Sequence, residues 1–161
     1  ILEVHHRGKV FGVVHAGSPF FYDPDPVSHW PDIIKKAKKD PEYAYYLMWD
    51  RSVISRVAED MYNNVNLDQM NKSLEFRESL LNNPEGIYKV TPDMLNPYMN
   101  NNIPAITGVD YVIHGHTGVF APTQYENMLW IDTKFCTGYF TLLNFNNEKD
   151  KWDAYFYDKE L

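Results

Sequence analysis

The sequence predicts a single α/β domain over residues 1–161, with a strand hairpin, a helical middle and a closing β-meander. Strand-like runs open the chain at residues 1–4 and 10–14, with a polar turn at 5–9 between them. Apolar residues then recur at helical spacing, and four short β-rich runs fill the last third. A chain of this length is typical of one domain with its own core.

Local signals support the first strands and helices. The run from Val10 to His15 is apolar enough to be buried on both faces, as the strands of α/β sheets are. Pro31 stands where a helix can start, and Asp40-Pro41 ends that helix. Apolar periodicity predicts two more helices, over 43–65 and 66–83, and the turn cluster at 82–86 ends the second. An N-cap signal predicts a further helix that starts at Thr91.

The last third reads as strands joined by short connections. The predicted strands are 111–114, 128–132, 139–145 and 152–157, with a hairpin turn at 146–150 between the last two. The chain has no initial Met and opens directly in strand-like alternation, so we expect it to be cut from a longer protein.

Composition excludes several classes of partner. The net charge of −7 argues against a nucleic-acid or anionic-membrane surface, because both require clustered Lys and Arg. The basic run at 35–39 is best explained as a solvated helix face. A single cysteine, Cys136, excludes an internal disulfide and fits a reducing compartment, so we expect a cytoplasmic protein. No apolar run approaches the length that spans a bilayer, and no signal peptide is visible.

Two histidines in matching contexts are the first candidates for chemistry. His15 and His116 each follow an apolar, β-branched run and are followed within two residues by Gly or Thr. A sheet can deliver such side chains from strand ends into one site, where two neutral imidazoles suit a divalent transition metal. The alternative is that each is a buried histidine bonded to a loop carbonyl.

Three further residues could support such a site. His114 is expected to point away from His116, because side chains alternate along a strand, so it either packs or supports the site from behind. Arg51 is opposed by the dipole of the helix it begins and needs an anion, which is either a carboxylate such as Asp50 or a substrate phosphate. Asp132 could accept the second N–H of a metal-bound imidazole, or could simply cap a turn.

Four segments in this order resemble the C-terminal half of a calcineurin-like metallophosphoesterase. The similarity is to bacterial and phage (lambda-type) serine/threonine protein phosphatases and covers nearly the whole chain. The segments are 9–19 with His15-Ala16-Gly17, Trp49-Asp50-Arg51, Gly115-His116-Thr117, and 127–133 with Asp132-Thr133.

The resemblance implies half of an αββα sandwich around a dinuclear metal site. His15 and His116 would ligate one of the two ions, Mn²⁺ or another divalent transition metal, and Arg51 would contact phosphoryl oxygens. The reaction would be hydrolysis of a phosphorylated protein or a small phosphoester by a metal-activated water.

The motifs of the family's first half are missing from this sequence. Gly-Asp-x-His-Gly, Gly-Asp-x-Val-Asp-Arg-Gly and Gly-Asn-His-Glu do not occur. We therefore expect the chain to be inactive unless that half is supplied, and its open sheet edge to favour a homo-oligomer. Two alternatives remain: a dinucleoside-tetraphosphate hydrolase of the same superfamily, whose aromatic loop at 20–30 stacks a base, and a non-catalytic module whose histidines only pack.

Overall fold

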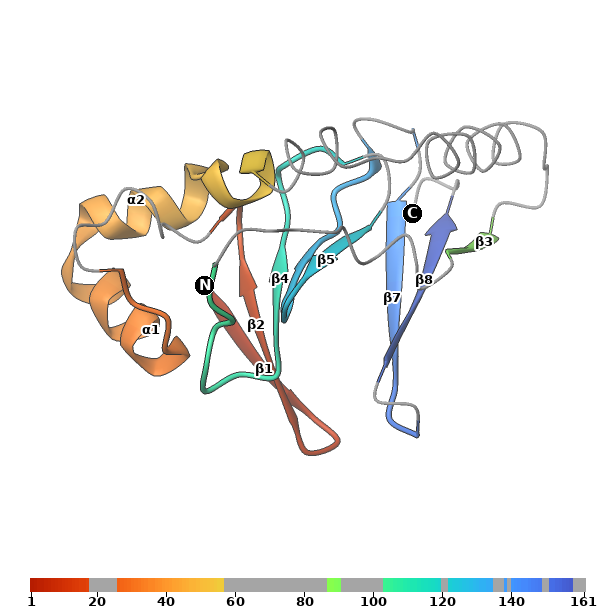
Figure 1. The fold of residues 1–161 in the computed structure, drawn as a ribbon, viewed down its shortest axis with the longest axis horizontal. Helices are drawn as coiled ribbons and strands as arrows, with labels where there is room; N and C mark the ends of the chain where they lie inside the picture. Colours follow the sequence, from red (N-terminus) through yellow and green to blue (C-terminus); the bar gives the residue numbers. More distant parts are fainter. Residues whose placement is uncertain are drawn as a thin grey trace.

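The computed structural model describes residues 1–17, 26–56, 87–90, 103–119, 122–134, 138, 140–148 and 151–157. These residues form three layers that follow one another along the long axis of the molecule (Figure 1): two helices, a five-stranded sheet and a three-stranded sheet. The α/β class is therefore confirmed. The predicted helix 66–83, the N-cap at Thr91, Cys136 and most of the aromatic loop lie outside the described residues.

The five-stranded sheet is mixed. Its strands, in spatial order, are β1 (Leu2–His6), β2 (Lys9–Val14), β4 (Tyr111–His114), β6 (Met128–Trp130) and β5 (Thr123–Tyr125). The three central strands β2, β4 and β6 are parallel, whereas β1 and β5 run antiparallel at the two edges. Since parallel strands end at the same side of a sheet, the loops after β2, β4 and β6 meet there.

The opening hairpin is tighter than the sequence predicts. The strands β1 and β2 pair up to His6 and Lys9, which leaves a two-residue turn in place of the predicted turn over 5–9. Arg7 and Gly8 both have positive φ, at 48° and 79°. Positive φ at both residues is typical of a two-residue turn whose twist matches that of the flanking strands. Glycine adopts a positive φ without steric cost.

The two helices cover one face of this sheet. Helix α1 (Trp30–Lys39) has Pro31 in its first turn, and its last turn is basic, which suits the helix dipole. Asp40 separates it from α2 (Pro41–Trp49) and accepts hydrogen bonds from the backbone N–H of Glu42 and Tyr43. The core of this interface is apolar and includes Trp30, Ile33, Leu47, Val112 and Trp130.

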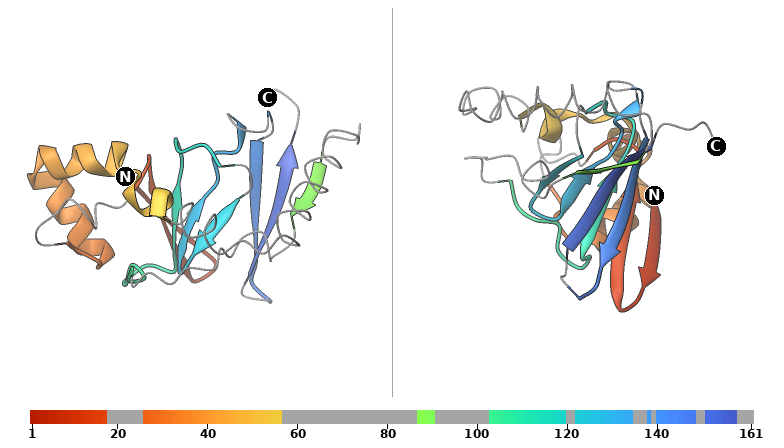
Figure 2. Two further views of the ribbon diagram at one scale, coloured as in Figure 1. Left: turned by 45° about the horizontal axis from the view of Figure 1, so that its top comes forward. Right: turned by 90° about the vertical axis from the view of Figure 1, so that its right-hand side faces the viewer.

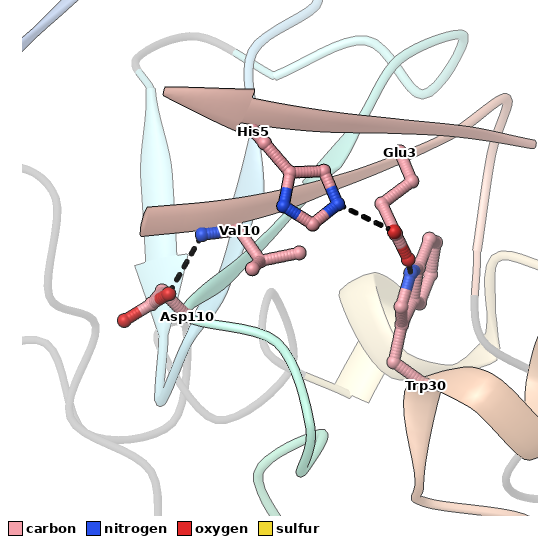
Figure 3. Close-up of polar contacts among 5 residues, drawn as sticks. All are labelled: Glu3, His5, Val10, Trp30 and Asp110. Carbon is pink, nitrogen blue, oxygen red and sulfur yellow. Dashed lines mark hydrogen bonds and ion pairs between the residues drawn. The ribbon is translucent and has the colours of Figure 1, made fainter. Parts of the chain in front are cut away.

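Close contact between α1 and the sheet depends on a glycine. A Cβ at Gly12 would lie 2.6 Å from the ring of Trp30, so only glycine lets that ring pack this closely against β2. The Trp30 indole N–H also donates to the carboxylate of Glu3 on β1, at 2.8 Å (Figure 3). On the far side of the hairpin, the Val10 N–H donates to the carboxylate of Asp110 at 2.7 Å.

The helix predicted over 43–65 is broken. Helix α2 ends at Trp49, and a new helical stretch is described from 52 to 56. Asp50 causes the break, because its carboxylate accepts from the backbone N–H and the hydroxyl of Ser52, at 2.8 and 2.9 Å. Such a side-chain cap favours a helix start over helix continuation.

A second sheet covers the other face of the first. It consists of β3 (Ile87–Val90), β8 (Lys151–Tyr157) and β7 (Phe140–Asn146), all antiparallel and in that order (Figure 2). Phe11, Tyr111, Phe145 and Trp152 join the two sheets, with ring centroids 5.1 to 6.1 Å apart. Mostly edge-on packing of this kind adds to the hydrophobic gain of the interface.

The predicted closing meander is wrong. The strand at 111–114 is confirmed without change as β4, and the hairpin of β7 and β8 is confirmed within a residue at each end. However, β4 and β6 are parallel partners in the first sheet, whereas β7 and β8 belong to the second. Strand β5 was not predicted, and neither was β3, which lies between the turn cluster at 82–86 and the helix start predicted at Thr91. Within the described ranges, no helix combines the length and hydropathy needed to cross a membrane.

Candidate metal site

The structure brings His15 and His116 together. His15 directly follows β2, and His116 lies two residues beyond the end of β4, its parallel neighbour. The two ring centroids are 4.4 Å apart, with an angle of 27° between the planes. Both side chains are exposed, so the alternative of two buried histidines held by loop carbonyls does not describe this structure.

Backbone geometry after β4 sets the position of His116. The Gly115 N–H donates to the Val14 carbonyl at 3.4 Å, and the Thr117 N–H donates to the Gly115 carbonyl at 2.7 Å. His116 itself has a φ of 54°, in the left-handed region that residues other than glycine rarely adopt. Strain of this kind clusters at functional sites, because the surrounding structure must hold it in place.

The segment after His15 is fixed to the end of α2. The backbone N–H groups of Ala16 and Gly17 both donate to the Leu47 carbonyl, at 3.2 and 3.4 Å. A Cβ at Gly17 would collide with the carbonyl oxygen of Asp50, so a glycine is required for this close approach. The contact brings Trp49, which directly precedes Asp50 in the chain, next to the histidines.

Trp49 is a site residue that the sequence did not identify. Its ring stands edge-on to both imidazoles, with centroids 5.8 Å from His15 and 5.0 Å from His116. It remains 45% exposed, which is unusual for a tryptophan. The sequence does contain a signal for this residue, because Trp49 belongs to the segment Trp49-Asp50-Arg51 that resembles the phosphatases.

Arg51 lies between the two helical stretches and is exposed. Its carbonyl accepts from the Ser55 N–H at 2.8 Å, so it begins the stretch at 52–56. The carboxylate of Asp50, its expected partner, is buried and bonded to Ser52. Burial raises the pKa of Asp50, and the two bonds from Ser52 oppose that shift. Within the described part of the chain, no carboxylate pairs with the Arg51 guanidinium.

His114 packs in the core beneath the site. It is fully buried, and its ring stacks on Trp130 with centroids 4.7 Å apart and planes 14° apart. Neither ring nitrogen has a hydrogen bond of good geometry to any described residue, although the backbone of Ala16 is near enough to stabilise the charged form slightly. Desolvation dominates and lowers the pKa of His114 to about 3, so the ring is neutral.

Asp132 follows β6 at the same side of the sheet and is half-buried. Its backbone carbonyl accepts from the Val119 N–H at 2.9 Å, which ties the loop after β4 to the loop after β6. Among the described residues, its carboxylate makes no hydrogen bond to either imidazole. Its expected contact with a metal-bound histidine therefore stays a prediction.

The distance between the two ring centres matches that of two imidazoles bound to one ion. A metal–nitrogen bond of about 2 Å places the centre of a coordinated ring about 3 Å from the ion. Two rings at neighbouring positions of an octahedral ion then have centres roughly 4.5 Å apart. The observed separation is 4.4 Å. No group of three or more His, Cys, Asp or Glu side chains suited to a metal is found in the described ranges, so His15 and His116 are the two candidate ligands that those ranges offer there.

Neither a scan against protein-family models nor a search of curated proteins finds a match for this sequence.

Proposed function

We propose that this chain is the C-terminal half of a metallophosphoesterase αββα sandwich that hydrolyses phosphate monoesters. The substrate would be a phosphoserine or phosphothreonine protein, as in the protein phosphatases that the sequence resembles. The observation that carries the proposal is the pair of His15 and His116, stacked 4.4 Å apart where two adjacent parallel strands end. The three layers of the described residues fit the sandwich.

The residues of the site divide the chemistry between them. His15 and His116 would hold one divalent ion, Mn²⁺ or a similar metal, which supplies an activated water and neutralises charge on phosphorus-bound oxygens when bound. Arg51 would bind those oxygens, because its guanidinium is exposed and Asp50 is committed to Ser52. Trp49 keeps the two imidazoles in place by its edge contacts.

The other ligands would come from the missing half of the same fold. Two neutral imidazoles without a bridging carboxylate make a weak site, because the carboxylate supplies charge and holds two ions together. We therefore expect the chain alone to bind Mn²⁺ weakly and to give no turnover of an aryl phosphate. A robust rate from the chain alone would contradict this division of the site.

Calorimetry with Mn²⁺ tests the metal role against the alternative of a non-catalytic module. The wild type should bind about one ion, and His116→Ala should lose most of the heat, because one remaining imidazole is a poor ligand set. His6→Ala is the matched control, since His6 is exposed on β1 and lies at the opposite end of the hairpin. Identical traces for the wild type and His116→Ala would show that the histidines only pack.

A further inference from the structure

Helix α2 carries exposed apolar side chains next to the histidine pair. Tyr45, Met48 and Trp49 are 55%, 44% and 45% exposed, although all three side chains are large and mostly apolar. Their spacing of i, i+3 and i+4 places them on one face of the helix. We call these three residues the α2 patch. Exposed apolar side chains that gather beside a polar site are typical of an interaction surface.

The α2 patch is continuous with the proposed phosphate site. Its last member, Trp49, has a ring centroid 5.0 Å from that of His116 and 5.8 Å from that of His15. The Tyr45 ring lies 6.4 Å from the Trp49 ring, one helical turn further from the end of α2. A ligand whose phosphate lies at the two imidazoles can therefore place its next groups over Trp49 and then over Tyr45.

Ring contacts hold the patch in one arrangement. Tyr45 packs against Trp49 with 45° between the planes, and it stands edge-on to Tyr46 with centroids 6.3 Å apart. Tyr46 is fixed in turn, because its hydroxyl donates to the Glu42 carboxylate at 3.2 Å. Rings that are already ordered lose little conformational entropy when a ligand binds, so the patch is suited to binding.

The distance between the two rings matches the repeat of an extended peptide. Such a chain advances roughly 3.3 Å per residue and its side chains alternate, so residues two apart lie on one side, roughly 6.6 Å from each other. The 6.4 Å between Tyr45 and Trp49 is nearly the same step. A phosphorylated residue that points into the site shares its side of the peptide with the second and fourth residues along. Those two side chains would contact Trp49 and Tyr45.

The chemistry of the patch favours apolar side chains over charged ones. With a metal bound, the site carries the charge of the ion and of Arg51, so it would repel a basic side chain beside the phosphate. The carboxylate of Asp50 is buried and bonded to Ser52, and that of Glu42 accepts from Tyr46. An acidic side chain would lose hydration against the rings, whereas an apolar one gains by leaving water.

We propose that the α2 patch binds the residues beside the phosphorylated serine or threonine of the substrate, and that it selects large apolar side chains at the second and fourth positions. Tyr45 and Met48 are then specificity-determining residues, whereas the phosphate is held by groups that every substrate shares. The inference rests on the proposed function, and it names the class of phosphopeptide that the site accepts.

Binding of two phosphoserine peptides to the full chain in the presence of Mn²⁺ tests the proposal. One peptide has leucine at the second and fourth positions on both sides of the phosphoserine, and the other has glutamine there. The wild type should bind the leucine peptide about tenfold more tightly. Tyr45→Ser should remove most of this preference and leave the affinity for inorganic phosphate unchanged. Leu142→Ser is the matched control, since Leu142 is 45% exposed on β7 of the second sheet and should keep the preference.

Tryptophan fluorescence gives a second measurement on the same complexes. The chain has four tryptophans, of which Trp30, Trp130 and Trp152 are buried and Trp49 is exposed. Quenching of the fluorescence by acrylamide therefore reports mainly on Trp49. At equal saturation, the leucine peptide should reduce this quenching more than the glutamine peptide does, because its apolar side chain covers the ring.

The outcomes separate this inference from the proposed function. Equal affinity of the wild type for the two peptides overturns the apolar preference, and competition by inorganic phosphate then leaves the phosphate site standing. Tighter binding of an arginine-flanked peptide, or of adenosine monophosphate, also overturns it. Should inorganic phosphate not bind at all, the unphosphorylated leucine peptide tests the patch alone: protection of Trp49 that Tyr45→Ser removes supports the patch, and absence of protection overturns it.

Discussion

Protonation of His114 should couple the stability of the fold to pH. The pKa of this buried imidazole falls from its ordinary 6.5 to about 3, because desolvation penalises the charged ring. Between these two values the unfolded chain binds a proton that the folded chain does not. The contribution of neutral His114 to the free energy of unfolding is therefore fully present above pH 6.5 and is lost as pH falls toward 3. From pH 7 to pH 5 the free energy of unfolding decreases by about 2 kcal/mol.

Urea denaturation of the wild type and of His114→Phe at the two pH values measures this coupling. Phenylalanine preserves the stack on Trp130 and cannot be protonated, so the variant should lose about 2 kcal/mol less than the wild type between pH 7 and pH 5. Any cost of the larger ring is the same at both pH values and cancels. His6→Gln, at an exposed position, should keep the wild-type dependence. Equal losses in the wild type and His114→Phe would refute the reasoning.

Three further substitutions test the elements around the site. Gly17→Ala should destabilise the protein by about 1–3 kcal/mol, because the new methyl group collides with the Asp50 carbonyl; a thermal midpoint equal to that of the wild type would contradict this. Trp152→Ala should cost about 3–5 kcal/mol in urea denaturation, since its ring joins the two sheets, and a loss below about 1 kcal/mol would show that the sheets pack by other contacts. Arg51→Ala should weaken binding of inorganic phosphate in the presence of Mn²⁺ by about fivefold to tenfold and leave Mn²⁺ binding unchanged, and an unchanged phosphate affinity would exclude the guanidinium from the site.

Local signals predicted the elements that depend on local chemistry. Strand β4 and helix α1 were predicted to within a residue, because β-branched runs, Pro31 and the Asp40-Pro41 stop act on their immediate neighbours. The break after Trp49 was missed although its cause is local as well. Asp50 followed by Ser52 can cap a helix, but the apolar periodicity runs through both residues and conceals the cap.

Pairing between distant strands could not be predicted in the same way. Nothing in the run at 128–132 distinguishes a strand parallel to β4 from one of an antiparallel meander, because the difference lies in the path of the connection. The meeting of His15 and His116 was predicted from matching strand-end contexts. The position of Trp49 depends on hydrogen bonds from Ala16 and Gly17 to Leu47, which no spacing in the sequence reveals.

Paramagnetic broadening by Mn²⁺ tests the central claim most directly. In proton spectra of the full chain with far less Mn²⁺ than protein, the ring signals of His15 and His116 and the indole signal of Trp49 should broaden first, because the proposed site would hold the ion between the two imidazoles. The ring signals of His5 and His29, which are exposed on β1 and beside α1, should stay sharp. Broadening that is uniform over all the histidines, or that spares residues 15 and 116, would contradict a shared metal site.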